Sequence, residues 1–81
     1  MKEIVDDLKY GAICIVCNPV MSVYIQDSDS VNHDGSIRYD LILEKTEPYE
    51  LVLHGTYTSM ASAKRAGQDQ WLRMYADRHS R

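Results

Sequence analysis

The spacing of apolar residues changes near residue 58 of this chain of 81 residues, and that change constrains the fold more than any other feature. In three segments between residues 20 and 57 the apolar residues recur at every second position, as they do in strands buried on one face. From Met60 they recur at steps of three and four, which is the period of a helix with one buried face. We therefore expect an antiparallel sheet followed by a long C-terminal helix, within a single domain that spans residues 1–81.

Three or four segments are predicted to build the sheet. Residues 12–17 form a run of small and β-branched apolar residues, which is typical of a strand covered on both faces. Residues 20–26 alternate, and Asn18-Pro19 separates the two segments, so residues 12–26 form either a hairpin or one strand bent at the proline. Two further segments alternate in the same way: residues 37–43 and 49–57.

The alternation also predicts which side chains share a face of the sheet. On the last strand it places Leu51 and Leu53 toward the helix and Val52 on the opposite face. That second face would then carry Tyr24, Ile42 and Val52 among charged and polar residues. Such a mixture is more typical of a partner-binding surface than of a core.

A short helix is predicted ahead of the sheet. Ile4, Val5 and Leu8 share one helical face within residues 2–9, and Gly11 is a natural stop. The chain is thus predicted to be an α+β domain. It would have a small antiparallel sheet of three to four strands, with a short N-terminal helix and a long C-terminal helix packed on one face.

The C-terminal helix carries an apolar stripe that can seal the sheet. Ala63 and Gly67 would let the two backbones approach closely, and Trp71 and Met74 would fill the wider gap beyond them. A glycine costs a helix about 1 kcal/mol relative to alanine, so close packing is the simplest explanation for Gly67.

The residue types present favour a binding protein over an enzyme. The sequence has no nucleophile elbow, phosphate-binding loop or pair of catalytic carboxylates, so we expect neither catalysis nor a cofactor. Cys14 and Cys17 are expected to be buried structural residues, with a zinc site or a redox pair as the alternatives. No basic leader and no bilayer-length apolar run occurs, so we expect a cytoplasmic protein.

Charge is distributed unevenly along the chain, whose net charge is −3. Residues 1–58 contain ten acidic and four basic residues, whereas residues 59–81 contain five basic and two acidic residues. This balance predicts a protein partner with a basic surface, met by carboxylates on the strand loops and by one exposed tyrosine. The candidate contact residues are Asp27, Asp29, Asp34, Glu44, Glu47, Glu50 and Tyr24.

The entry to the C-terminal helix suggests a second candidate function. This stretch resembles, over about nine residues, the final helix of double-stranded RNA-binding domains. The residues that match the motif of that family are Ser59, Ala63, Lys64 and Ala66. The resemblance implies a similar topology, although Met60 and Ala61 stand where that family carries phosphate-binding lysines. The alternative is therefore a nucleic-acid-binding regulator that uses the basic helix residues Lys64, Arg65, Arg73 and Arg78.

By its small size, acidity and lack of catalytic motifs, the chain also resembles the small phage-encoded inhibitor proteins of the anti-CRISPR kind. That resemblance implies a protein that occludes a groove or an interface of a host defence complex. It also places such a protein in the host cytoplasm. A homodimer joined along an exposed strand edge is a further expectation, because short open sheets leave unpaired edges.

Overall fold

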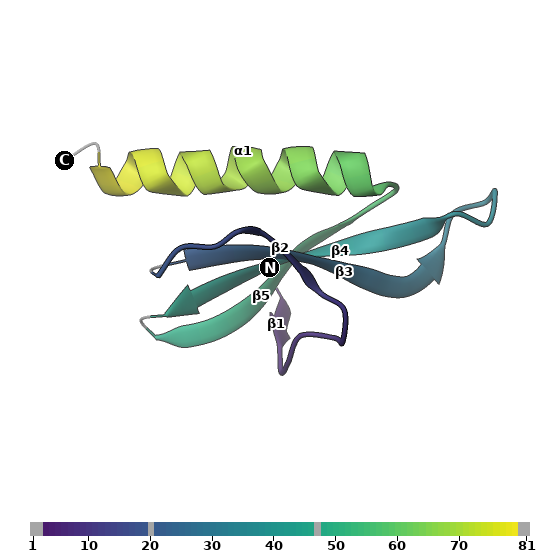
Figure 1. Ribbon diagram of the computed structural model, residues 1–81, viewed down its shortest axis with the longest axis horizontal. Coiled ribbons are helices and arrows are strands. Elements are labelled where there is room, and N and C mark those ends of the chain that lie inside the picture. The colour runs from purple at the N-terminus through teal and green to yellow at the C-terminus, as the bar shows by residue number, and fades with distance from the viewer. Residues whose placement is uncertain (1–2, 20, 47, 80–81) are drawn as a thin grey trace.

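Five strands form one antiparallel sheet, and a single long helix lies across one face of it (Figure 1). The computed structural model describes residues 3–19, 21–46 and 48–79. The order of strands across the sheet is β1-β5-β4-β3-β2. Along the chain the elements are β1 (Glu3–Val5), β2 (Ile13–Val16), β3 (Met21–Val31), β4 (Ile37–Thr46), β5 (Tyr49–Tyr57) and α1 (Met60–His79).

The predicted arrangement of three to four strands and two helices is wrong, because the N-terminal segment forms a strand rather than a short helix. β1 pairs with the outer edge of β5, with Glu3 opposite Leu53 and Val5 opposite Leu51. A helix of one or two turns has little stability of its own, whereas an open sheet edge offers hydrogen-bond partners to any adjacent extended segment. The additional strand, β1, therefore forms from residues whose apolar spacing is compatible with either a helix or a strand.

Residues 12–26 form two strands joined in a hairpin, which resolves the alternatives left by Asn18-Pro19. β2 pairs with β3 in antiparallel register, with Ile13 opposite Ile25. Ser22 closes the connection, since its hydroxyl donates to the carbonyl of Asn18 and accepts from the Asn18 N–H, both at 3.2 Å. The chain therefore reverses direction at the proline instead of bending there.

Helix α1 packs closely against the sheet because Gly67 has no side chain. A Cβ atom at this position would lie 2.7 Å from Cδ1 of Ile15 and 3.0 Å from both Leu41 Cδ1 and Val23 Cγ1. Trp71 and Met74 pack against the same cluster farther along the helix. The fully buried core between helix and sheet consists of Val23, Ile25, Leu41, Leu43 and Ala63.

A bulge in β5 reverses the predicted facing of its first half. Leu41 pairs with Gly55 but Ile42 pairs with Leu53, so His54 is an extra residue on β5. Val52 therefore lies opposite Leu43 on the helix side and is 6% exposed. Leu53 shares the second face with Ile42, contrary to the strict alternation of the sequence.

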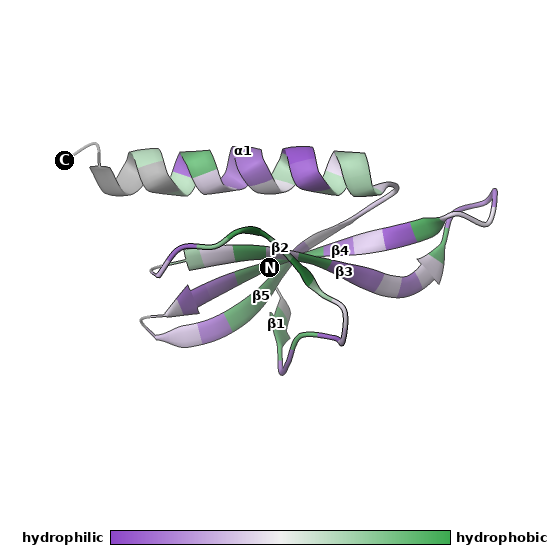
Figure 2. Cartoon of the chain, viewed as in Figure 1, coloured by the Kyte–Doolittle hydropathy of each residue, from purple (hydrophilic) through white to green (hydrophobic). Residues whose placement is uncertain are grey.

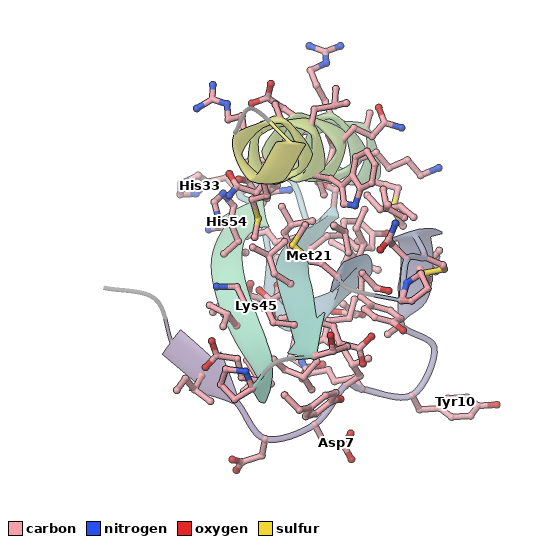
Figure 3. The ribbon with its side chains drawn as sticks, turned by 90° about the vertical axis from the view of Figure 1, so that its left-hand side faces the viewer. Asp7, Tyr10, Met21, His33, Lys45 and His54 are labelled. Atoms are coloured by element: carbon pink, nitrogen blue, oxygen red, sulfur yellow. A yellow bond between two sulfur atoms is a disulfide. The ribbon has the colours of Figure 1, made fainter. Side chains whose placement is uncertain are left out.

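The second face of the sheet is not open, because the segment of residues 6–12 crosses it. β1 lies at one edge of the sheet and β2 at the other, so the chain between them must span the whole sheet. It does so on the side away from α1 (Figure 3). Its backbone is held to β3 by a 2.9 Å hydrogen bond from the Lys9 N–H to Oε1 of Gln26. Beneath it Ile42 is 0% exposed, so its predicted role in a partner-binding surface is wrong.

The β3–β4 hairpin projects as an arm beyond the start of α1 (Figure 1). The polar segment of residues 27–36 is strand in its first half, since β3 runs to Val31 with a register shift after Asp27, and the turn follows from residue 32. The arm is mostly hydrophilic (Figure 2), although Val31 and Ile37, which pair across it, are both exposed.

Candidate protein-binding surface

Carboxylates gather on the side of the molecule that faces away from the helix. Asp6 and Asp7 lie exposed on the crossing segment, and Asp7 points outward from that side (Figure 3). Asp40 and Glu44 alternate with the helix-side residues of β4 and so lie on the second face. We call this surface the acidic side, and it consists of Asp6, Asp7, Asp29, Asp40 and Glu44.

Glu44 is held between two tyrosine hydroxyls on the acidic side. The hydroxyl of Tyr24 donates to Oε1 at 3.4 Å, and that of Tyr49 donates to Oε2 at 3.1 Å. Burial and then the Glu44 charge raise the pKa of Tyr24, while the hydrogen bond to Glu44 is the main reason why the pKa of Tyr49 is raised. Tyr24 is half-buried and Tyr49 is exposed, so the cluster offers one fixed and one accessible aromatic ring.

Lys9 is the cation of the crossing segment, and it is paired with an acid. Its ammonium group contacts Asp29 and also donates to the carbonyl of Asp27 at 2.9 Å. The hydrogen bond to Asp29 raises the pKa of Lys9, and the charges of Asp40 and Asp27 add to the effect. The three carboxylates of Asp27, Asp29 and Asp40 therefore outnumber the one ammonium group of Lys9, and this part of the surface is negatively charged.

Asp34 has a local structural role at the tip of the arm. Its Oδ1 accepts hydrogen bonds from the Ser36 hydroxyl at 2.6 Å and the Ser36 N–H at 2.9 Å. These bonds lower the pKa of Asp34, the hydroxyl contributing most. At pH values above the ordinary pKa of an aspartate, Asp34 is ionised and its hydrogen bonds stabilise the tip. This contribution to stability is lost as the pH falls through the lowered pKa of Asp34.

The Ser36→Ala variant should raise the pKa of Asp34 toward its ordinary value. The rise should be incomplete, because the backbone N–H of residue 36 still donates. An acid titration that follows the Asp34 side-chain carboxyl carbon by NMR measures the change. An unchanged titration midpoint would contradict the hydrogen-bond origin of the shift.

The residues predicted for partner binding do not form one cluster. Asp27 and Asp29 lie beside Lys9, whereas Glu50 lies opposite Lys45 on the neighbouring strand. Glu47 lies outside the described residues. Four further residues of this surface were not predicted from the sequence, namely Asp6, Asp7, Asp40 and Tyr49. The adjacent pair of carboxylates near the N-terminus was the one sequence signal for part of this set.

The basic residues predicted for nucleic-acid binding are spread around the helix. At about 100° per residue, Lys64 and Arg73 lie on nearly opposite sides of α1, and Arg65 lies between them. Arg73 is also paired with Asp69, whose carboxylate lies 3.1 Å from its Nε. The side chain of Arg78 is outside the described part of the structure. The described residues thus present no continuous row of cations for a phosphate backbone.

Cys14 and Cys17 form a disulfide, so the expectation of two buried structural cysteines is wrong. Cys14 is half-buried and Cys17 is exposed. β2 ends at Val16, which lets the chain turn and bring the two Cα atoms to 6.1 Å, within the usual range for a disulfide. Across residues 3–19, 21–46 and 48–79, no three His, Cys, Asp or Glu side chains are placed to hold a metal ion.

Reducing this disulfide should lower the free energy of unfolding by at most about 2 kcal/mol, because the bond closes a very short loop. Urea unfolding with and without a reductant measures the effect. The Cys14→Ser, Cys17→Ser double variant controls for other actions of the reductant. A far larger loss would show that the bond has a wider role in the fold.

Comparisons with known proteins add no relative. No family model matches the chain, and no curated protein or solved structure matches it at a significant level. Within the described residues, no helix combines the length and the apolar character needed to cross a membrane.

Proposed function

We propose that this chain is a non-enzymatic protein-binding module that meets a basic surface of its partner with its acidic side. One observation carries the proposal, namely that the layers of the fold separate the charges. The helix bears the exposed residues Lys64 and Arg65. On the opposite side of the sheet, the crossing segment carries the exposed residues Asp6 and Asp7, and Asp7 points away from the sheet there (Figure 3). The charge gradient along the sequence thus corresponds to a gradient through the molecule.

Such an arrangement favours oriented association. A basic partner is attracted to the acidic side and repelled by the helix, so complementary charge speeds the encounter and selects its geometry. Tyr49 provides exposed aromatic area next to Glu44, and tyrosine is enriched in protein interfaces. The attraction should weaken as salt is added, because exposed charges are screened over about 10 Å at 0.1 M salt.

Within this class, the resemblance to anti-CRISPR-like inhibitors makes a host defence complex the favoured partner. The nucleic-acid-binding groove of such a complex is basic, and an acidic protein that fills it blocks access by occlusion.

This proposal places the chain in the host cytoplasm, where disulfides are usually reduced. Alkylation of free thiols in intact cells, read by mass spectrometry, should then find Cys14 and Cys17 reduced.

The test uses the full chain as bait in a host-cell lysate at low salt. The Asp6→Lys, Asp7→Lys variant should reduce the association rate with the captured protein roughly 10-fold or more, because both side chains are exposed. The Lys64→Glu, Arg65→Glu variant is the matched control: it changes charge by the same amount on the opposite side, and it should not slow association, because the helix cations repel a basic partner. Circular dichroism confirms that both variants are folded.

Two results would overturn the proposal. One is capture that is unaffected by reversal of Asp6 and Asp7 at low salt. The other is capture that depends on Lys64 and Arg65 and disappears after nuclease treatment, since that outcome indicates the nucleic-acid-binding alternative.

A further inference from the structure

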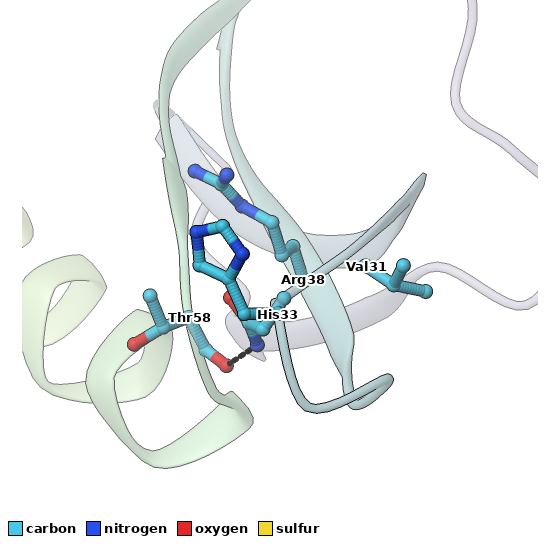
Figure 4. A pocket seen from close by; sticks show the side chains of 5 residues that line it. Val31, His33, Arg38 and Thr58 are labelled. Atoms are coloured by element: carbon cyan, nitrogen blue, oxygen red, sulfur yellow. Dashed lines mark hydrogen bonds between the residues drawn. The ribbon is translucent and has the colours of Figure 1, made fainter.

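A pocket of about 390 Å³ lies where the β3–β4 arm meets the turn into α1 (Figure 4). A 2.8 Å hydrogen bond from Nδ2 of Asn32 to the carbonyl of Thr58 joins the two segments. The volume falls within the usual range for small-molecule sites, about 300–1,000 Å³. The lining residues are Val31, Asn32, His33, Arg38 and Thr58.

Arg38 contributes its guanidinium to the lining of the pocket. Its Nε is buried and has no hydrogen-bond partner among the described residues, so a ligand in the pocket would meet the terminal nitrogens of this half-buried side chain. A buried donor left unpaired is costly, and most such donors in native proteins are satisfied by the protein, water or a bound group. Asp40 follows two residues later on β4, yet it accepts a 2.7 Å hydrogen bond from Thr56 and forms no salt bridge with Arg38.

The other lining groups suit an anion with an apolar portion. The ring of His33 lines the pocket together with the Arg38 guanidinium (Figure 4), and an imidazole can donate a further hydrogen bond. Val31 contributes an exposed aliphatic surface at the same site. A guanidinium fork matches the paired oxygens of a carboxylate or a phosphate.

We propose that this pocket binds the oxyanion group of a small ligand, a carboxylate or a phosphate, with Arg38 as the principal donor and His33 beside it. Alternation along β4 places Arg38 on the same face as Asp40, but the pocket is lined by none of the carboxylates of the acidic side, so the site does not depend on the proposed function. It is also built by different residues.

The test titrates the ¹⁵N-labelled full chain with two probes, inorganic phosphate and butyrate, against sodium chloride at equal ionic strength. Either probe should produce saturable shifts of the Asn32, His33 and Arg38 amides. Tighter phosphate binding identifies a phosphate ligand. Tighter butyrate binding that weakens in Val31→Ala identifies a carboxylate with an aliphatic chain.

Arg38→Gln should weaken the binding of either probe roughly 10-fold or more, since hydrogen bonds to charged groups are the stronger ones. Arg65→Gln removes a cation from the exposed helix surface and should leave binding unchanged. The Asp6→Lys, Asp7→Lys variant should keep the site as well, which distinguishes this proposal from the proposed function. Shifts no larger than those with sodium chloride, or equal binding by Arg38→Gln, would overturn the inference.

Discussion

Replacing Gly67 by valine should lower the free energy of unfolding by about 3 kcal/mol, the upper end of typical overpacking penalties. The Cβ of the new side chain would lie 2.7 Å from Ile15 and 3.0 Å from Leu41, and two methyl groups would extend farther into the same space. Leu41 is fully buried and cannot withdraw without moving its neighbours. The helix must therefore lift away from the sheet and lose part of its packing. Urea unfolding measures the loss.

The control places the same substitution on the neighbouring exposed position. Gln68→Val changes helix propensity by a few tenths of a kcal/mol and introduces no steric overlap, so its stability should stay near that of the wild type. If Gly67→Val were as stable as Gln68→Val, the close docking of α1 would be wrong.

Replacing Ile42 by alanine should cost about 2–5 kcal/mol, the usual range for emptying a filled core position. The side chain is 0% exposed on the face opposite the helix, where residues 6–12 cross the sheet. This prediction distinguishes the structure from the sequence-based expectation, in which Ile42 lies on an accessible binding face and its truncation has little effect. Thermal or urea unfolding of the variant decides between them.

Ile4→Ala is the matched control for this substitution. Ile4 is also an isoleucine in a strand, but it lies at an edge and is 67% exposed. Its truncation should change stability by about 0.5 kcal/mol or less, as is usual for surface sites. Equal effects at the two positions would contradict the covering of the second face.

The C-terminal helix and its apolar stripe could be predicted because their local signals agree. The spacing of Ala63, Gly67 and Trp71 requires a helical face, and the absence of a side chain at Gly67 explains its close approach to the sheet. The hairpin at Asn18-Pro19 was predicted only as one of two alternatives, because a proline ends a strand without setting the direction of the next segment.

Two features of the sheet, strand β1 and the facing of β5, could not be predicted, since each depends on pairing with residues that are distant in the sequence. Ile4 and Val5 suit a helix or a strand equally, and the open edge of β5 decides between the two. The extra residue His54 is also invisible to a pattern of period two, and it reverses the facing of Val52.

The candidate site was predicted in part, since Asp29, Glu44 and Tyr24 were named from the sequence, whereas the other members were not. Its carboxylates come from three separate parts of the sequence, and the crossing of residues 6–12 brings Asp6 and Asp7 to the same side as Glu44.

Arg38 gave no sequence signal, because an isolated arginine in an alternating strand is typical of an ordinary solvent-exposed position. Its significance comes from burial of Nε beside the arm.

Paramagnetic relaxation of amide protons by small nitroxides of opposite charge tests the separation of charges most directly. The two probes compare local potential residue by residue and need no partner. A cationic nitroxide should relax the Asp6 and Asp7 amides more than an anionic one does, and the preference should be reversed at Lys64 and Arg65. The same preference at both places would contradict the charge separation on which the proposed function rests.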